Sequence, residues 1–366
     1  MIGNSQHGFG AYRPPGIDAG AAMLRADHAT APVLAESDFP EAVRQPQANY
    51  AALDLGTNNC RLLVARPARG GFRVVDAFSR IVRLGEGLST TGALSEAAMA
   101  RTIEALKVCA GKIGQRKVTA GRYVATEACR RAENCNEFID RVRDEIGIEL
   151  EIISTGEEAR LVVAGCAPLL HPRIPHALVF DIGGGSTEIV WLRRHGSRYG
   201  VPEILGSVSL QFGVVTFTER FGGIEVSPVI YRAMVAEAEA ALQPFEREHG
   251  IRREVRARQV QMLGSSGTVT TLAGVHLALP RYIRACVDGS MLTFDQIELV
   301  SRHLAGLDIE GRAANPCVGR ERADLVLSGC AILDAICAIW PVGRLRVADR
   351  GIREGILFEL MQGTPE

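Results

Sequence analysis

Residues 181–190 read DIGGGSTEIV and place three glycines directly after an acidic residue. The apolar residues on either side otherwise have the pattern of a buried β-hairpin. Glycine weakens a strand, so it usually marks a bulge or a close approach of another group to the backbone. Because small residues leave successive N–H groups uncovered, such a turn forms a concave site that binds anions, phosphate above all. The stretch therefore predicts a phosphate-binding turn between two strands.

The same pattern occurs once more, closer to the start of the chain. Residues 177–194, ALVFDIGGGSTEIVWLRR, align with residues 50–67, YAALDLGTNNCRLLVARP. Asp54 falls on Asp181, an offset of 127 residues. Helical and strand patterns alternate after each copy. The chain therefore reads as two related α/β halves with a cleft between their turns, and such clefts often bind ligands.

The expected division of the chain follows from this repeat. Residues 49–165 form the first half and residues 166–366 the second. Residues 1–48 are rich in glycine, proline and alanine and lack periodicity, so we expect a flexible N-terminal tail. The first half should include a long helix over residues 94–114, with Ser95 as its N-cap.

Composition excludes several classes of protein. The formal net charge of the 366 residues is −1, which argues against a general binder of nucleic acid or of membrane surfaces. No stretch reaches transmembrane length. The nine cysteines include no C-x-x-C pair, so neither a disulfide framework nor a zinc ribbon is expected. These features predict a cytoplasmic protein that holds any anionic ligand through local groups.

Three turns carry the residues expected to bind phosphate. Other phosphate motifs are absent, since no G-x-x-x-x-G-K-[ST] sequence occurs and residues 183–188 do not complete G-x-G-x-x-G. The third turn, LGSSGTVTTLA at residues 263–273, precedes a helix and is suited to an adenosine or a further phosphate. The expected phosphate-binding residues are Gly56, Thr57 and Asn58 in the first turn, Gly183, Gly184, Gly185, Ser186 and Thr187 in the second, and Gly264, Ser265, Ser266, Gly267 and Thr268 in the third.

Three acidic residues accompany the first two turns. Asp54 and Asp181 end equivalent strands, and Glu188 lies in the second turn. Carboxylates beside bound phosphates usually hold Mg²⁺, which keeps several waters and bridges to phosphate oxygens. We therefore expect Mg²⁺ as the cofactor, with Asp54, Asp181 and Glu188 as its ligands.

Two adjacent glutamates open a helix in STGEEAR, residues 154–160. Ser154 with Glu157, and Thr155 with Glu158, each fit a capping box, in which the glutamate bonds back to the cap residue. A helix needs only one such cap. The other glutamate is free to deprotonate a water for attack on a terminal phosphoryl group. Spacing alone does not choose between them.

Together these residues resemble the exopolyphosphatase / guanosine pentaphosphate phosphohydrolase family, part of the superfamily of actin, Hsp70 and the sugar kinases. The resemblance runs from about residue 50 to the last helix. It implies two ribonuclease-H-like (actin-like ATPase) domains facing a central cleft, in a short form without the C-terminal HD-like domain of longer members. The motifs that carry it are AALDLGTNNCRLLVA, GEGL, ATEACRRAEN, EIISTGEEARL, VFDIGGGSTEIV, GSSGTVTTLA and VADRGIREGIL.

The resemblance also implies an activity and roles for residues. A Mg²⁺-dependent phosphohydrolase is expected, which releases terminal orthophosphate from inorganic polyphosphate, guanosine pentaphosphate or both by in-line attack of an activated water. Glu158 matches the proposed base of the family, and Asp181 and Glu188 match its metal or catalytic acids. Arg130 matches a position expected to contact phosphate. Glu127 departs from the family, in which this position is often small or hydroxylic.

Two alternatives are an ATP-dependent kinase of the same superfamily and a sensor of phosphorylated nucleotides without turnover. The lack of a zinc-type Cys/His cluster speaks against the kinase, and the intact acids speak against the sensor. The sequence does not rank polyphosphate against guanosine pentaphosphate, because the turns contact phosphates and not bases. It leaves the oligomeric state open, with a homodimer as one alternative. Neither nucleic acid nor a membrane is an expected partner.

Overall fold

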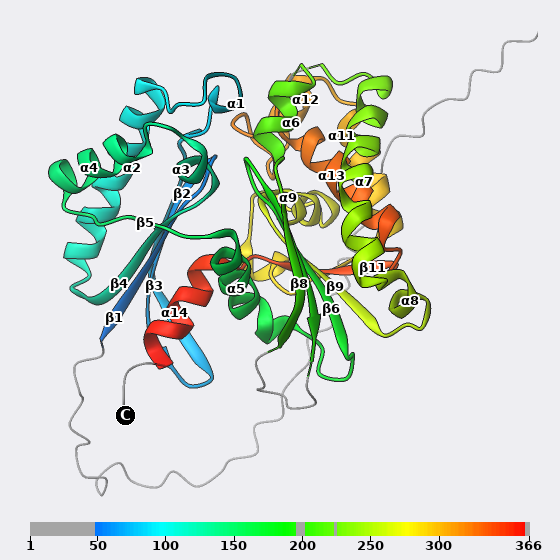
Figure 1. Ribbon diagram of the computed structural model, residues 1–366, viewed down its shortest axis with the longest axis horizontal. Coiled ribbons are helices and arrows are strands. Elements are labelled where there is room, and N and C mark those ends of the chain that lie inside the picture. The colour runs from blue at the N-terminus through cyan, green and yellow to red at the C-terminus, as the bar shows by residue number, and fades with distance from the viewer. Residues whose placement is uncertain (1–47, 195–201, 223–224, 363–366) are drawn as a thin grey trace, which may run out of the picture.

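The computed structural model describes residues 48–194, 202–222 and 225–362, and the expected tail lies outside these ranges except for residue 48. Two β-sheets organise the described chain (Figure 1). The first comprises β1 (Asn49–Leu55), β2 (Asn59–Ala68), β3 (Gly71–Ile81), β4 (Val118–Ala125) and β5 (Glu151–Ile152). The second comprises β6 (His176–Ile182), β7 (Thr187–Arg193), β8 (Glu203–Leu210), β9 (Val260–Ser265), β10 (Met291–Thr293) and β11 (Arg344–Ala348).

Helices connect and cover the strands. In the first half they are α1 (Leu88–Thr91), α2 (Glu96–Gln115), α3 (Glu127–Arg131), α4 (Cys135–Ile146) and α5 (Thr155–Cys166). After a 3₁₀ turn (Ala167–Leu169), the second half has α6 (Val214–Arg220), α7 (Pro228–His249), α8 (Ile251–Arg256), α9 (Gly267–His276), α10 (Arg284–Val287), α11 (Phe294–Ala305), α12 (Ile309–Ala314), α13 (Val326–Ile339) and α14 (Ile352–Gln362). The expected long helix is confirmed as α2, where the Ser95 hydroxyl accepts a bond from the Ala98 amide at 3.2 Å.

The two sheets share one topology. Their strand orders are β3-β2-β1-β4-β5 and β10-β11-β9-β6-β7-β8. In each sheet an antiparallel meander (β1-β2-β3 or β6-β7-β8) is extended by a parallel strand, β4 beside β1 and β9 beside β6. The predicted fold class is confirmed: the chain is α/β, with two ribonuclease-H-like domains that face a central cleft.

Two helices fill the space between the sheets. One buried cluster joins side chains of α5 and α14 to Ala52 and Leu63 of the first sheet and to Val179 and Val190 of the second. Figure 1 shows α14 beside α5 between the sheets. Although α14 ends the second half, it packs on β1 of the first half. The helix that carries Glu158 is therefore held by both sheets.

The outer faces have separate cores. Helices α2 and α4 cover the first sheet around Phe138 and Leu106, which are fully buried. Helices α7, α9, α11 and α13 cover the second sheet around Trp340 and Phe217. No helix within the described ranges is both long enough and apolar enough to cross a membrane.

Candidate active site

The two glycine turns have the same hydrogen-bond plan. In the first, the Gly56 amide donates to the Asn59 carbonyl at 2.9 Å. In the second, the Gly183 amide donates to the Ser186 carbonyl, also at 2.9 Å. Both bonds join residues three apart. Each follows a strand whose penultimate residue is an aspartate, Asp54 in β1 and Asp181 in β6. The repeat seen in the sequence is therefore a repeat of backbone geometry.

Neighbouring segments occupy the carbonyls of the turns. The Gly183 and Gly184 carbonyls accept bonds from the Val214 and Val215 amides at the start of α6, at 2.9 and 2.8 Å. By contrast, the amides of Gly184, Gly185 and Ser186 donate to no group in the described part of the chain. With the carbonyls occupied and the N–H groups free, the second turn presents donors only, as an anion site requires.

The first turn follows the same rule. The Thr57 carbonyl accepts from the Gly85 amide at 3.0 Å, and the Asn58 carbonyl accepts from the Val82 and Arg83 amides. The Thr57 and Asn58 amides have no acceptor among the described residues. Gly85 belongs to the GEGL motif, so this motif supports the first turn from behind.

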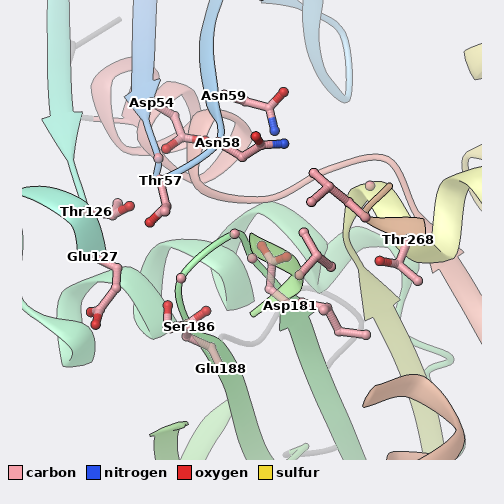
Figure 2. Close-up of a pocket in the computed structure, with 18 of the residues that line it drawn as sticks. Asp54, Thr57, Asn58, Asn59, Thr126, Glu127, Asp181, Ser186, Glu188 and Thr268 are labelled. Carbon is pink, nitrogen blue, oxygen red and sulfur yellow. The ribbon is translucent and has the colours of Figure 1, made fainter. Parts of the chain in front are cut away.

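The turns lie against each other around a cavity of about 110 Å³ (Figure 2). A Cβ placed on Gly185 would lie 2.7 Å from the Thr57 hydroxyl, and one on Gly184 would lie 3.0 Å from the Asn58 Cβ. Only glycine permits this approach. Nearly all residues expected in the first two turns line the cavity, namely Gly56, Thr57, Asn58, Gly183, Gly184, Gly185 and Ser186. Thr187 does not, because it lies in β7 and its hydroxyl donates to the Phe212 carbonyl at 2.8 Å.

The third turn reaches the cavity only in part. Gly267 and Thr268, at the N-terminus of α9, line it, while Ser265 and Ser266 line an adjoining cavity. Gly264 lies inside β9, where a Cβ would meet the Phe180 ring at 2.6 Å. Its glycine is therefore explained by packing against Phe180.

The three expected metal ligands also line the cavity. Burial raises the pKa of Asp181 to about 7, although Arg61 acts in the opposite direction. Burial likewise raises the pKa of Glu188 to about 7, and it raises the pKa of Asp54. The Asp181 charge also raises the pKa of Glu188, so the carboxylates disfavour one another's ionisation. Together they form an acidic wall of the cavity.

This wall meets one requirement of a Mg²⁺ site. Mg²⁺ is usually held by one or two carboxylates, with water and phosphate oxygens as its remaining ligands. In the described part of the chain, no three acidic, histidine or cysteine side chains are grouped closely enough to hold a metal ion alone. The donor set therefore fits an ion shared with a bound phosphate better than an ion resident in the free protein. The Mg²⁺ requirement itself stays a prediction.

The structure separates the two adjacent glutamates. The Ser154 hydroxyl accepts a bond from the Glu157 amide, so Ser154 is the N-cap of α5. The Glu157 carboxylate points to Arg122 and Arg160, 2.8 Å from a nitrogen of each. Glu158 is only 7% exposed and lines the cavity. Burial raises its pKa to about 8, with a further contribution from the Glu188 charge. Of the two, only Glu158 is placed to act on a ligand between the turns.

Arg130 does not line the cavity wall. Its Nη1 donates to Glu158 Oε2 at 2.7 Å and to the Ile153 carbonyl at 3.0 Å. Its Nη2 donates to Glu127 Oε2 at 2.9 Å. The phosphate contact expected for Arg130 stays a prediction, since the guanidinium is bonded to protein groups. Glu127 is 3% exposed and does line the cavity.

Two arginines were missed by the sequence argument. Arg61 and Arg322 both line the cavity. The Arg61 side chain makes no hydrogen bond or ion pair among the described residues, although its charge acts on Asp54 and Asp181. The Arg322 guanidinium bonds only to the Thr271 hydroxyl in this part of the chain, at 3.4 Å. Burial and the Arg61 charge lower the pKa of Arg322. Arg61 could have been found, because the 127-residue offset places it on Glu188. No local signal marks Arg322.

A larger cavity of about 660 Å³ continues from the first. Both are lined by Asn59, Arg61 and Arg322. Six arginines line the larger one: Arg61, Arg284, Arg320, Arg322, Arg350 and Arg353. Three of them have acidic partners, and Arg61, Arg322 and Arg353 have none among the described residues. The combined space therefore suits an extended anion that is longer than one phosphate.

Known proteins share this sequence pattern. The model of the Ppx/GppA phosphatase family matches residues 63–364. A protein of Aeromonas hydrophila named guanosine-5'-triphosphate,3'-diphosphate pyrophosphatase is 32% identical over 313 residues, which are 85% of this chain and 59% of that protein. A Photobacterium profundum protein of the same name is 28% identical over 319 residues, with the same coverage. The chain thus spans 59% of the length of these curated relatives.

Solved structures share the fold over most of the chain. The Aquifex aeolicus member of the Ppx/GppA family has a TM-score of 0.70 at 29% identity and covers 88% of this chain and 100% of its own. An exopolyphosphatase from Cytophaga hutchinsonii has a TM-score of 0.76, covering 87% of this chain and 99% of its own. At 24% identity, the second likeness concerns the fold alone.

Proposed function

The chain belongs to the Ppx/GppA phosphatase family, and from this premise we propose that it is a phosphohydrolase. It would release terminal orthophosphate from inorganic polyphosphate, guanosine pentaphosphate or both. One observation carries the proposal: free amides of two opposed turns and two arginines without acidic partners face the cavity that Glu158 also lines. Donors for a phosphoryl group and a base for water thus share one small space.

Each group has a distinct role in this reaction. The amides of the turns, with Arg61 and Arg322, would neutralise charge on the phosphoryl oxygens as the bond to the leaving phosphate lengthens. Glu158 would accept the proton of the attacking water, which positions the nucleophile in line with the leaving group. A pKa of about 8 makes this carboxylate a stronger base than an exposed glutamate. Most of the rate enhancement should come from positioning and charge neutralisation.

Mg²⁺ would be held by one or two of the carboxylates of Asp54, Asp181 and Glu188 together with the substrate phosphates. When bound, it would supply positive charge that offsets the negative charge of these groups. Without a cation, these carboxylates repel both one another and the substrate. We therefore expect calorimetry to detect tight Mg²⁺ binding only when tripolyphosphate is present, because the acidic groups alone give an incomplete site.

The second cavity supports a substrate with several charged groups. Its arginines without acidic partners continue from the turns into a space of about 660 Å³, which is large enough for a nucleoside or for several phosphates. Because the cavity could hold either a nucleoside or several phosphates, we propose both inorganic polyphosphate and guanosine pentaphosphate as substrates. The name of the Aeromonas relative concerns a guanosine nucleotide.

The direct test is orthophosphate release by the purified chain in Mg²⁺, with long-chain polyphosphate, tripolyphosphate, guanosine pentaphosphate and ATP as separate substrates. Release from any of the first three that stops on addition of EDTA would support the proposal. Release from guanosine pentaphosphate alone would restrict it to nucleotide turnover. Binding of these compounds without release would contradict it and favour a sensor.

A further inference from the structure

We infer that Arg130 is a positioning residue, which fixes the carboxylate of Glu158 at the cavity, and that Glu127 fixes Arg130 in turn. The inference rests on the proposed function, in which Glu158 acts on water. It assigns a role to Glu127 and replaces the phosphate contact expected for Arg130.

The hydrogen bonds of Arg130 leave it little capacity for a ligand. A guanidinium has five N–H donors in a rigid fork. Nη1 donates to both Glu158 and the Ile153 carbonyl, while Nη2 and Nε donate to Glu127 Oε2 at 2.9 and 3.3 Å. Four of the five donors are thus used within the protein. A forked contact with phosphate needs two donors, so at least one of these bonds would have to break.

The same bonds give Glu158 a defined orientation. Its Oε2 receives Arg130, whereas its Oε1 accepts no hydrogen bond from the described residues. One oxygen is therefore held and the other is available to a water. Ile153 lies just before the N-cap of α5, so Arg130 also fixes the start of the helix that carries Glu158. Through these contacts the short helix α3 is tied to α5.

Glu127 explains why the guanidinium stays on Glu158. It is 3% exposed, and its Oε1 has no hydrogen-bond partner among the described residues, with the Arg131 Nε 4.0 Å away. A buried carboxylate on the wall of an anion site repels the ligand, so its presence needs another reason. Its Oε2 takes two donors of Arg130. Held by both acids, Arg130 cannot turn toward the phosphates without giving up its bonds to Glu127, which would keep only the longer ion pair with Arg131.

The experiment compares Arg130→Ala and Arg130→Lys in the wild type and in Glu158→Gln. The matched control is Arg122→Ala. It removes an arginine partner of Glu157, which precedes Glu158 on α5. We expect Arg130→Ala to lower kcat about 10²-fold with KM unchanged, because a base displaced by about 1 Å loses that much. The lysine variant should recover part of this loss. Arg122→Ala should keep kcat within about twofold.

The double variants separate positioning from contact. If Arg130 acts through Glu158, Arg130→Ala should lower kcat little further in the Glu158→Gln background, since the effects of groups that act as a unit are not additive. Likewise, Glu127→Ala should lower kcat in the wild type and add nothing to Arg130→Ala. A full additional loss in Glu158→Gln, or a large rise in KM, would overturn the inference in favour of a phosphate contact.

Two readouts do not depend on turnover. Calorimetry with tripolyphosphate should give equal affinities for Glu158→Gln and Arg130→Ala/Glu158→Gln, and a weaker double variant would contradict the inference. A crystal structure of Arg130→Ala should show the Glu158 carboxylate displaced, and an unmoved carboxylate would likewise contradict it. If the wild type releases no phosphate, the proposed function fails, whereas these two measurements still test the link from Arg130 to Glu158.

Discussion

Arg61 and Glu188 occupy equivalent positions in the two halves. Each lies across a hairpin from the aspartate before the turn, Arg61 opposite Asp54 and Glu188 opposite Asp181. A duplicated backbone thus carries a cation in one copy and an anion in the other. In the proposed reaction, this difference would let Arg61 neutralise phosphate while Glu188 offers a carboxylate.

Gly185 tests the contact between the turns. In Gly185→Ala the new Cβ would lie 2.7 Å from the Thr57 hydroxyl and 3.2 Å from the Glu127 Cγ, so the turns must separate. We expect kcat/KM for phosphate release to fall at least tenfold, since small displacements of positioned groups are costly. The control is Gly111→Ala in the exposed part of α2, where a Cβ meets nothing within 4 Å. It should leave kcat/KM unchanged and stabilise the fold by about 0.5–1 kcal/mol. Equal kcat/KM values for Gly185→Ala and Gly111→Ala would contradict the close contact between the two glycine turns.

Glu158 should make stability depend on pH. Burial and the charges of Glu188 and Asp54 raise its pKa from 4.5 to about 8, and Arg130 opposes them. The folded chain therefore binds this proton more tightly than the unfolded chain, so the group's contribution to stability is lost as the pH rises between those values. Glu158→Gln cannot ionise. Its thermal midpoint without Mg²⁺ should exceed that of the wild type by about 2 °C or more at pH 8 and by little at pH 5. The same difference in thermal midpoint at both pH values would argue against a raised pKa of the buried Glu158 carboxyl group.

At the scale of elements, α5 and α14 meet through glycines. A Cβ on Gly165 would lie 2.1 Å from the Gly351 carbonyl oxygen, and one on Gly355 would lie 2.2 Å from the Leu161 carbonyl oxygen. This approach lets both helices fit between the sheets. It also brings Ile352, at the start of α14, to the same cavity as Glu158.

Gly165→Ala should separate these helices. We expect a loss of about 1–3 kcal/mol in the free energy of unfolding, the usual cost of overpacking, together with lower turnover. Gly156→Ala is the control within α5, because its nearest contact would be the Ser154 hydroxyl at 3.9 Å. Urea denaturation of both variants measures the difference. A Gly165→Ala protein as stable as Gly156→Ala would show that the helices can move apart freely.

The sequence predicted those elements that a local pattern of residues defines. The paired turns were predictable, because Asp followed by glycine and small polar residues commonly forms a turn with uncovered N–H groups, and this pattern occurs twice. Spacing alone did not choose between Glu157 and Glu158, since both fit a cap. The family resemblance pointed to Glu158, and the structure separates the two by the direction of α5. The bond of Arg130 to Glu127 joins residues three apart on one helix, which spacing can suggest. Its bonds to Ile153 and Glu158 join α3 to the start of α5, and no spacing reveals them. The packing of α14 on the first sheet likewise depends on contacts distant in the sequence.

For the whole molecule, two contacts join the halves at the mouth of the cleft. Arg83 forms a forked pair with Asp324, at 3.0 and 3.1 Å. Glu219 of α6 accepts from the Gly87 amide at 2.9 Å and from the Ser89 hydroxyl. Figure 1 shows α1, which begins after Gly87, close to α6. These contacts should hold the cleft in its present width.

Removing both contacts should widen the cleft. Such exposed pairs contribute about 0–1 kcal/mol each, so Arg83→Ala/Glu219→Ala should raise KM a few-fold and increase the radius of gyration of the free protein. Tripolyphosphate should reverse the increase by closing the halves. Arg141→Ala, whose partners Glu96 and Glu145 lie in the first half, is the control. If Arg83→Ala/Glu219→Ala gave the same scattering profile as Arg141→Ala, a role of the two contacts in setting the width of the cleft would be ruled out.

The central claim is that Glu158, and not its neighbour Glu157, activates water for phosphate release. It is tested most directly by measuring kcat for orthophosphate release in Mg²⁺ from the substrate that the wild type turns over best, in Glu158→Gln and Glu157→Gln side by side. The account predicts a loss of about 10²–10⁴-fold in Glu158→Gln, the usual contribution of a general base, and a change within a few-fold in Glu157→Gln. Full turnover by Glu158→Gln, or an equal loss in both variants, would contradict it.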